Sequence, residues 1–238
     1  MMTGIFMEIG GTIISSVEYQ GKISLVIFMA KCPLRCPYCH NSELLESGEE
    51  TSLEEIFKKI DDSVDYIDSV VVSGGEPLVQ SKELIEILKY TKSLNLKTKL
   101  DTSGCYPKRL NEVLKYIDYV ALDIKAPFDK YVDLIGMDVG YKVEESMNIA
   151  NKSDNTFLEC RTTYVPTLID HDDIKQISRE IECDVYTLQQ FRNNNVLDER
   201  LEEIESPNPN ELRNLAKEIK PVLNKVKIKT AEFGEEYI

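Results

Sequence analysis

Short apolar runs alternate with longer amphipathic runs along most of the chain. Six of the short runs are rich in β-branched and aromatic residues, and several, such as Val70-Val71-Val72, are almost continuously apolar. Runs of this kind predict strands that are covered on both faces, as in a parallel sheet. The predicted strands are Ile23–Phe28, Ser69–Ser73, Lys97–Thr102, Tyr119–Ile124, Phe157–Val165 and Val185–Gln190.

The segments between these strands carry apolar residues at helical spacing. Ser52 precedes the run LEEIFKKI and has Glu55 three residues later, which predicts a helix that begins with a capping box. A second helix is expected from Ser81 onward, because apolar residues recur at 84, 85, 87 and 88. Four more helices are expected over Lys108–Tyr116, Val143–Asn151, Asp172–Glu182 and Pro209–Ile219.

Strand–helix alternation predicts an α/β fold in which right-handed crossovers join parallel strands. Six units are fewer than the eight that close a full barrel, so we expect a partial, open (β/α)6 barrel. A flat, doubly wound sheet is the alternative. Gly10-Gly11 predicts a tight turn that makes Ile5–Tyr19 an N-terminal β-hairpin. The last segment, Val226–Ile238, fits either a strand or a tail.

Composition limits the classes of function. The chain has 238 residues, 42% of them hydrophobic, which suits one core and predicts a single domain over residues 1–238. Its 42 acidic and 28 basic residues give a net charge of −14, which argues against nucleic acid or an anionic membrane as a partner. It has no apolar stretch of the roughly 20 residues that a membrane helix needs. The N-terminus lacks the basic and apolar regions of a signal peptide, so a cytoplasmic protein is expected.

Three of the six cysteines fall within eight residues, directly after the first strand of the predicted barrel. Cys32, Cys36 and Cys39 can bind one face of a four-iron, four-sulfur cluster and leave one iron open to a substrate. A zinc site with His40 as the fourth ligand is an alternative, although two adjacent ligands are awkward for one tetrahedral ion. A ferredoxin-type site would need a fourth cysteine at its own spacing. The remaining cysteines are scattered and are expected to be small buried residues: Cys105, Cys160 and Cys183.

The segment GKISLVIFMAKCPLRCPYCHN, residues 21–41, resembles the opening of radical S-adenosylmethionine (SAM) enzymes. The shared features are the Cys-x3-Cys-x2-Cys spacing and an aromatic residue, Tyr38, before the third cysteine. Cys39-His40-Asn41 is typical of the activating enzymes of glycyl-radical proteins, including anaerobic ribonucleotide reductase and pyruvate formate-lyase. The resemblance implies that the three cysteines hold a four-iron, four-sulfur cluster and that Tyr38, Cys39 and His40 border bound SAM.

A second motif, Gly74-Gly75-Glu76, follows the second strand of the predicted barrel. Glycines let the backbone approach a ligand closely, and a glutamate can accept a hydrogen bond from an ammonium group. An ordinary strand-to-helix turn is the alternative. Downstream of the cysteine motif, these residues resemble the family's methionine-binding segment, which implies that all three contact SAM.

Polar residues also close the next three strands. Asp101 and Thr102 resemble family residues that help to bind a monovalent cation near the methionine carboxylate, with a helix cap by Asp101 as the alternative. Asp123 and Lys125 resemble the family's Asp-Leu-Lys segment, which implies that Lys125 pairs with that carboxylate and that Asp123 holds the cation or orients the lysine. Arg161 lies in a segment that resembles the family's Arg-x3-Val-Pro. It is therefore expected to contact SAM, with a structural ion pair as the alternative.

These motifs keep the family order over residues 21–191, the expected core of the domain. All of them lie at the carboxyl ends of predicted strands, where β/α barrels place their active sites. Members of the family often have a histidine near the end of the sixth strand that contacts the adenosine. Phe191 occupies this region here and is the expected stacking partner for adenine.

The resemblance also implies a function and partners. An electron from a flavodoxin- or ferredoxin-type donor drives cleavage of SAM, and the 5′-deoxyadenosyl radical takes the Cα hydrogen of a glycine on a partner enzyme. Anaerobic ribonucleotide reductase is the first expected partner, because the chain lacks an insertion with further cysteine-ligated clusters. A small-molecule enzyme such as a 7-carboxy-7-deazaguanine synthase is the alternative, although its cysteine loop does not usually continue into His-Asn. A non-enzymatic metal-binding or electron-transfer protein is a third possibility.

Overall fold

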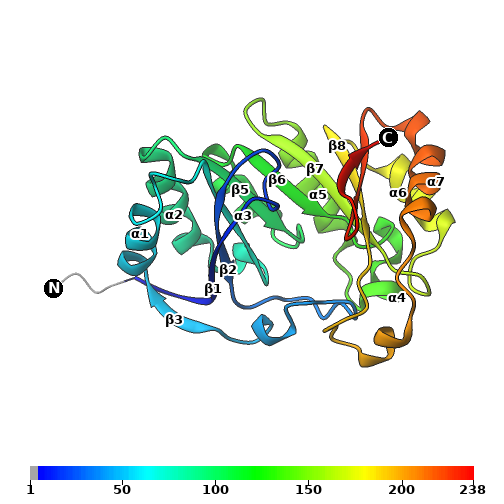
Figure 1. The fold of residues 1–238 in the computed structure, drawn as a ribbon, viewed down its shortest axis with the longest axis horizontal. Helices are drawn as coiled ribbons and strands as arrows, with labels where there is room; N and C mark the ends of the chain where they lie inside the picture. The colour runs from blue at the N-terminus through cyan, green and yellow to red at the C-terminus, as the bar shows by residue number, and fades with distance from the viewer. Residues whose placement is uncertain (1–4) are drawn as a thin grey trace.

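The computed structural model describes residues 5–238, whose strands form one ten-stranded sheet (Figure 1). The order across it is β10-β9-β8-β7-β6-β5-β4-β2-β1-β3, with β10 and β3 at the two edges, so the sheet does not close. The strands are β1 (Phe6–Ser15), β2 (Ser24–Met29), β3 (Glu49–Ser52), β4 (Ser69–Gly74), β5 (Lys97–Thr102), β6 (Tyr119–Asp123), β7 (Phe157–Tyr164), β8 (Val185–Gln190), β9 (Val226–Thr230) and β10 (Gly234–Tyr237).

Helices follow the parallel strands as the alternation predicts. Between neighbours, β2 and β4 to β9 pair in parallel, whereas β1, β3 and β10 pair antiparallel. The partial, open (β/α)6 barrel is therefore confirmed, with β2, β4, β5, β6, β7 and β8 as its six expected strands. The helices are α1 (Leu53–Asp61), α2 (Ser81–Ser93), α3 (Pro107–Val113), α4 (Tyr131–Ile135), α5 (Gly140–Asn151), α6 (His171–Glu180) and α7 (Pro209–Ile219).

Local sequence signals place two helix starts correctly. The Ser52 hydroxyl accepts from the Glu55 amide at 3.2 Å, and the Glu55 carboxylate accepts from the Ser52 amide at 2.8 Å, which completes the predicted capping box of α1. Helix α7 begins at Pro209, and the side chain of Asn208 caps it by accepting from the Glu211 amide at 3.0 Å. Each cap satisfies backbone donors that the first helical turn leaves unpaired.

Both ends of the sheet differ from the sequence prediction. β1 and β2 form an N-terminal antiparallel hairpin, but the bounds expected for it, Ile5–Tyr19, are wrong. β1 runs straight through Gly10-Gly11, and the turn comes after Ser15, before β2. The two glycines form a bulge instead: the pairing register shifts there, and Gly11 has a φ of 128°. At the other end, the segment left open between strand and tail forms β9, parallel to β8, and β10.

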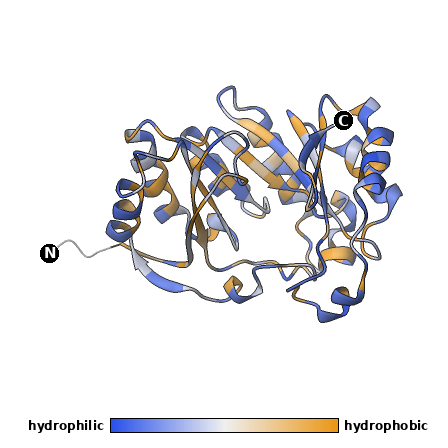
Figure 2. Cartoon of the chain, in the orientation of Figure 1, coloured by the Kyte–Doolittle hydropathy of each residue, from blue (hydrophilic) through white to orange (hydrophobic). Residues whose placement is uncertain are grey.

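The two faces of the sheet have opposite character. Apolar side chains lie between the sheet and the helices, and Figure 2 shows orange on the strands and on the sheet-facing sides of helices, with blue on the outer helix surfaces. Residues such as Leu158 and Cys160 of β7 belong to this core, whereas Glu159 and Arg161 alternate with them and point to the inner face. The expectation of two apolar faces therefore holds only on the helix side. No helix among residues 5–238 is long and apolar enough to cross a bilayer.

Candidate active site

A cavity of about 220 Å³ lies where the loop after β2 meets the carboxyl ends of β4 to β7. It gathers twelve of the fourteen residues that the sequence singled out for the site, although they come from positions 32 to 161 of the chain. Parallel strands bring their carboxyl ends to one edge, which is the physical reason for this convergence. The residues are Cys32, Cys36, Tyr38, Cys39, His40, Gly74, Gly75, Asp101, Thr102, Asp123, Lys125 and Arg161.

The three clustered cysteines are free thiols that line this cavity together. Burial raises the pKa of the Cys32 thiol to about 12 and also raises the pKa of Cys36. These thiols therefore carry protons until a metal binds, and forming the iron–thiolate bonds of a cluster would release those protons. Within the described residues, no three His, Cys, Asp or Glu side chains converge closely enough for a single metal ion. The three free thiols line one cavity, as the ligands of one shared iron–sulfur cluster would.

The cysteine loop is fastened to segments that the sequence did not single out. The Nδ1 atom of His40 lies 3.1 Å from the Asn194 carbonyl oxygen, and the Asp198 amide donates to the Pro37 carbonyl at 2.9 Å. Asn41 donates from Nδ2 to the Gly74 carbonyl at 3.3 Å. His40 is thus held by the segment after β8 through its Nδ1 atom.

Gly74 and Gly75 line the cavity, but close backbone packing explains their small size. Gly74 has a φ of 111°, and a Cβ there would lie 2.6 Å from the Met29 backbone nitrogen. A Cβ on Gly75 would lie 2.5 Å from the Lys31 carbonyl oxygen. The turn after β4 therefore packs directly against the end of β2, with the Gly75 amide donating to the Met29 carbonyl at 2.7 Å.

Glu76 is one of two predicted site residues that the structure does not bring to the cavity. It is fully buried, and its carboxylate accepts from the Leu78 amide at 3.0 Å, the Ser103 amide at 2.7 Å and the Thr102 hydroxyl at 2.8 Å. Burial outweighs these hydrogen bonds and raises its pKa. The structure thus shows Glu76 joining the turn after β4 to the end of β5, in place of an open acceptor for an ammonium group.

Phe191 was expected to stack on adenine, and this is wrong. Its side chain is completely buried within the hydrophobic core at the end of β8. An aromatic residue at the end of a strand can face the core as easily as a ligand, and the sequence alone does not reveal which.

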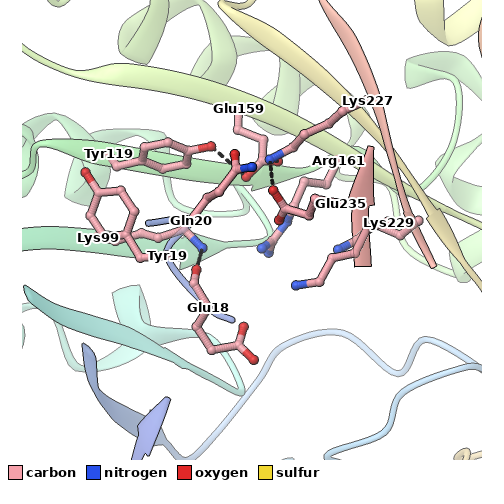
Figure 3. A pocket seen from close by; sticks show the side chains of 11 residues that line it. Glu18, Tyr19, Gln20, Lys99, Tyr119, Glu159, Arg161, Lys227, Lys229 and Glu235 are labelled. Carbon is pink, nitrogen blue, oxygen red and sulfur yellow. Dashed lines mark hydrogen bonds and ion pairs between the residues drawn. The ribbon is translucent and has the colours of Figure 1, made fainter. Parts of the chain in front are cut away.

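Charged side chains fill the inner face of the sheet beneath the cavity (Figure 3). The ammonium group of Lys227 lies 2.9 Å from Glu159 and 2.8 Å from Glu235, and the Tyr119 hydroxyl donates to Glu159 at 3.0 Å. Lys99 donates to the backbone carbonyl of Glu18 in the loop between β1 and β2. This layer was not predicted from the sequence, although charged residues at alternate positions of otherwise apolar strands are a signal for it.

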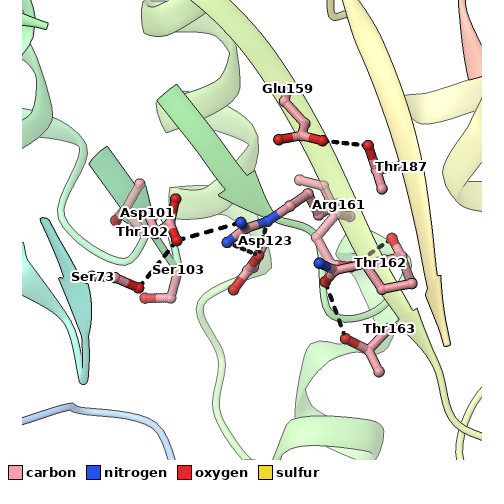
Figure 4. Close-up of polar contacts among 12 residues, drawn as sticks. Ser73, Asp101, Thr102, Ser103, Asp123, Glu159, Arg161, Thr162, Thr163 and Thr187 are labelled. Atoms are coloured by element: carbon pink, nitrogen blue, oxygen red, sulfur yellow. Dashed lines mark hydrogen bonds and ion pairs between the residues drawn. The ribbon is translucent and has the colours of Figure 1, made fainter. Parts of the chain in front are cut away.

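A second charged layer faces the cysteine loop and centres on Arg161 (Figure 4). Its guanidinium group lies 2.8 Å from Asp123 and 3.4 Å from Asp101, and Lys125 lies 3.2 Å from Asp123. Burial alone would raise the pKa of Asp101, but Arg161 and Lys99 outweigh it and lower the pKa to about 2. Burial would lower the pKa of Lys125, yet Asp123 and nearby groups keep it well above its usual value. The layer therefore stays fully charged at neutral pH.

Comparisons with known proteins agree with this geometry. The family model of the radical SAM superfamily matches residues 26–182. A protein of Methanocaldococcus jannaschii, provisionally assigned as a glycyl-radical enzyme activating enzyme, is 39% identical over 226 residues, covering 91% of this chain and 93% of its own. The pyruvate formate-lyase-activating enzyme of Clostridium pasteurianum is 39% identical over 140 residues, covering 54% of this chain and 55% of its own.

A similar fold occurs in a solved structure. The structure of Streptococcus suis SuiB bound to the precursor peptide SuiA matches with a TM-score of 0.64 at 18% identity, covering 86% of this chain and 48% of SuiB. At that sequence identity, the similarity supports a shared fold and nothing more. With the family model matching most of the chain and the three cysteines within the matched residues, this chain belongs to the radical SAM superfamily.

Proposed function

We propose that this chain is an activase that uses SAM to install a glycyl radical on a partner enzyme. The observation that carries the proposal is the convergence of three free thiols and a fixed set of cations on one cavity. Among radical SAM functions, activation of a glycyl-radical enzyme is supported by the archaeal relative, which aligns with nearly the whole chain and bears that assignment.

Membership of the superfamily implies a four-iron, four-sulfur cluster and SAM. When bound, the pair supplies a one-electron cleavage that yields methionine and a 5′-deoxyadenosyl radical, which takes a hydrogen atom from the Cα of a glycine. We assign Cys32, Cys36 and Cys39 as the ligands of three irons, which leaves the fourth iron for SAM. The protein binds and orients SAM and keeps water from the reactive species.

We propose that the cations of the charged layer centred on Arg161 orient SAM. Lys125 and Arg161 line the cavity, so each can pair with the methionine carboxylate while Asp123 holds both in place. The Tyr38 hydroxyl is buried and, within residues 5–238, has no hydrogen-bond partner, which suits a contact to a bound ligand. His40, Thr102 and the backbone of Gly74-Gly75 border the same space.

The proposal includes partners and a compartment. Anaerobic ribonucleotide reductase is the protein substrate to test first, and a flavodoxin- or ferredoxin-type protein is the proposed electron donor. We place the enzyme in the cytoplasm, because six free cysteines and a reducible cluster suit a reducing compartment. A single domain is proposed over the chain, since the sheet draws strands from both of its ends.

The test is the transfer of a radical to a partner. Reconstituted, reduced enzyme is mixed with SAM and candidate partner under anaerobic conditions, and the electron paramagnetic resonance spectrum is recorded. A glycyl radical that disappears when the partner's acceptor glycine is replaced by alanine is the expected result. Absence of any glycyl radical with every candidate partner would count against the activase.

The same preparation separates the other functions. Conversion of 6-carboxytetrahydropterin without any partner protein would identify a 7-carboxy-7-deazaguanine synthase. An enzyme that makes no 5′-deoxyadenosine, although it is reduced and holds its cluster, would be an electron-transfer or metal-binding protein. Production of 5′-deoxyadenosine is therefore the first measurement, and the choice of partner is the second.

A further inference from the structure

Lys99 carries an ammonium group that lies inside the open barrel. It stands two residues before Asp101 on β5, so both side chains point to the inner face of the sheet. Only 4% of Lys99 is exposed. Removing an ammonium group from water is costly unless fixed partners replace the water. The partners of Lys99 therefore indicate its role.

Three groups surround this ammonium. Its Nζ atom lies 3.0 Å from Asp101 Oδ1. It also donates to the Glu18 carbonyl oxygen at 2.5 Å and lies 5.5 Å from the centre of the Tyr119 ring (Figure 3). A carboxylate oxygen, a carbonyl oxygen and an aromatic face all attract a cation with a single charge. The Lys99 ammonium thus occupies a cation site built from three separate segments of the chain.

The carboxylates that were expected to bind a monovalent cation already face fixed cations. Asp101 pairs with Lys99 through Oδ1 and with Arg161 through Oδ2, and Asp123 pairs with Arg161 through Oδ1 and with Lys125 through Oδ2. The Thr102 hydroxyl donates to the buried carboxylate of Glu76. The Lys99 ammonium faces Asp101 Oδ1 at 3.0 Å without the alignment of a hydrogen bond, and within residues 5–238 that oxygen has no hydrogen-bond partner. The charges of the two aspartates are nevertheless already neutralised by the chain, because each of their oxygens lies within 3.4 Å of a fixed cation.

The fixed charges of the inner face are matched by one another. Lys99, Lys125 and Arg161 pair with Asp101 and Asp123, and Lys227 pairs with Glu159 and Glu235. Loss of the Lys99 charge would leave Asp101 with Arg161 as its one charged partner among the described residues. The cavity would then attract an incoming carboxylate, such as that of the methionine part of SAM, less strongly.

We propose that Lys99 is the built-in cation of the SAM site, taking the place of a dissolved monovalent ion. It acts as a positioning residue: it neutralises Asp101, which in turn holds Arg161 at the cavity. The inference rests on the proposed function, since it concerns how that cavity binds SAM. It predicts that SAM binding and cleavage do not depend on sodium or potassium.

The test compares salts and two variants. Equilibrium dialysis of SAM and formation of 5′-deoxyadenosine are measured with the reconstituted holoenzyme in potassium, sodium or choline chloride at constant ionic strength. Lys99→Ala removes the charge and leaves room for an ion, whereas Lys99→Met removes the charge but fills the space. Iron content and thermal melting are recorded for each variant to establish that it is folded and loaded.

The parent is expected to behave alike in all three salts. In choline, both variants should bind SAM about tenfold to a hundredfold more weakly, with a raised KM and a smaller change in kcat. Potassium or propylammonium should restore SAM binding by Lys99→Ala about tenfold and leave Lys99→Met unchanged, and the recovery should appear mainly in KM. Unequal rescue of two folded variants is a result that a merely structural lysine would not give.

Several outcomes would overturn the inference. They are a parent whose SAM binding needs potassium or sodium, a Lys99→Ala variant that binds SAM as well as the parent, and a Lys99→Ala variant that no cation rescues. If the parent binds SAM equally in all salts but makes no 5′-deoxyadenosine, the proposed function fails while the role of Lys99 in binding stands. A parent that binds no SAM in any salt overturns both.

Discussion

Cys36 is the most enclosed of the three clustered thiols. It is 7% exposed, and Lys125 lies among the charged groups that influence it. Burial raises the pKa of this thiol and Lys125 offsets the effect only in part, so bonding to iron has to displace its proton. By contrast, Cys183 does not line the cavity and is partly exposed at the start of the segment leading into β8. The two cysteines therefore offer a matched comparison.

Cys36→Ala is expected to lose the cluster and, with it, at least about 99% of 5′-deoxyadenosine formation, since two thiolates rarely retain a cube of four irons. Iron and acid-labile sulfide content after anaerobic reconstitution measure the first effect, and product formation measures the second. Cys183→Ala should keep the iron content of the parent. Parental cleavage activity in Cys36→Ala would disprove the assignment of the ligands.

At the level of elements, the turn after β4 explains how the cysteine loop is held. The loop and the turn share hydrogen bonds, and Gly74 can make this approach only because it lacks a Cβ. The turn also carries Glu76, whose carboxylate reaches the end of β5. Three consecutive residues thus join β2, β4 and β5 at the edge of the cavity.

Gly74→Ala is expected to destabilise the protein by about 3 kcal/mol, because an alanine there is strained at positive φ and collides with the Met29 backbone. Urea unfolding measures the loss, and reduced iron content should accompany it. Gly136→Ala is the control: Gly136 also has a positive φ, of 79°, but a Cβ there meets nothing within 4 Å. It should cost only about 1 kcal/mol. Equal losses in both variants would contradict the packing argument.

For the whole molecule, Asp118 joins three elements at the end of the barrel opposite the site. Its carboxylate lies 2.8 Å from Lys92 of α2 and 2.9 Å from Lys97, and accepts from the Thr98 amide at 2.9 Å. Burial alone would raise the pKa of Asp118, but these partners lower it to about 2 from an ordinary value of 3.8. The depressed pKa links global stability to pH.

Asp118→Asn is expected to lower the free energy of unfolding by about 1 kcal/mol at pH 7, after allowance for solvent screening. Because the folded-state pKa is the lower one, this contribution is present above about pH 4 and disappears as the pH falls from about 4 to about 2. Urea unfolding of parent and variant at several pH values measures it. A difference that stays constant through this acid range would exclude the ionic origin.

The sequence by itself determined the strand order along the chain, most helix starts and the residues that meet at the cavity. Strand-forming runs, caps and polar residues at strand ends are local signals, and the parallel arrangement of strands converts them into one site. The capping box at Ser52 and the cysteine spacing are examples that needed no knowledge of distant contacts.

Only the tertiary structure decided which way individual side chains face and which other residues they contact. The burial of Phe191, the enclosure of Glu76 by the end of β5 and the pairing of Lys99 with the loop after β1 depend on residues far away in the sequence. The glycines at 10 and 11 likewise form a bulge because β1 pairs with both β2 and β3. Such outcomes follow from packing between elements, and no single segment encodes them.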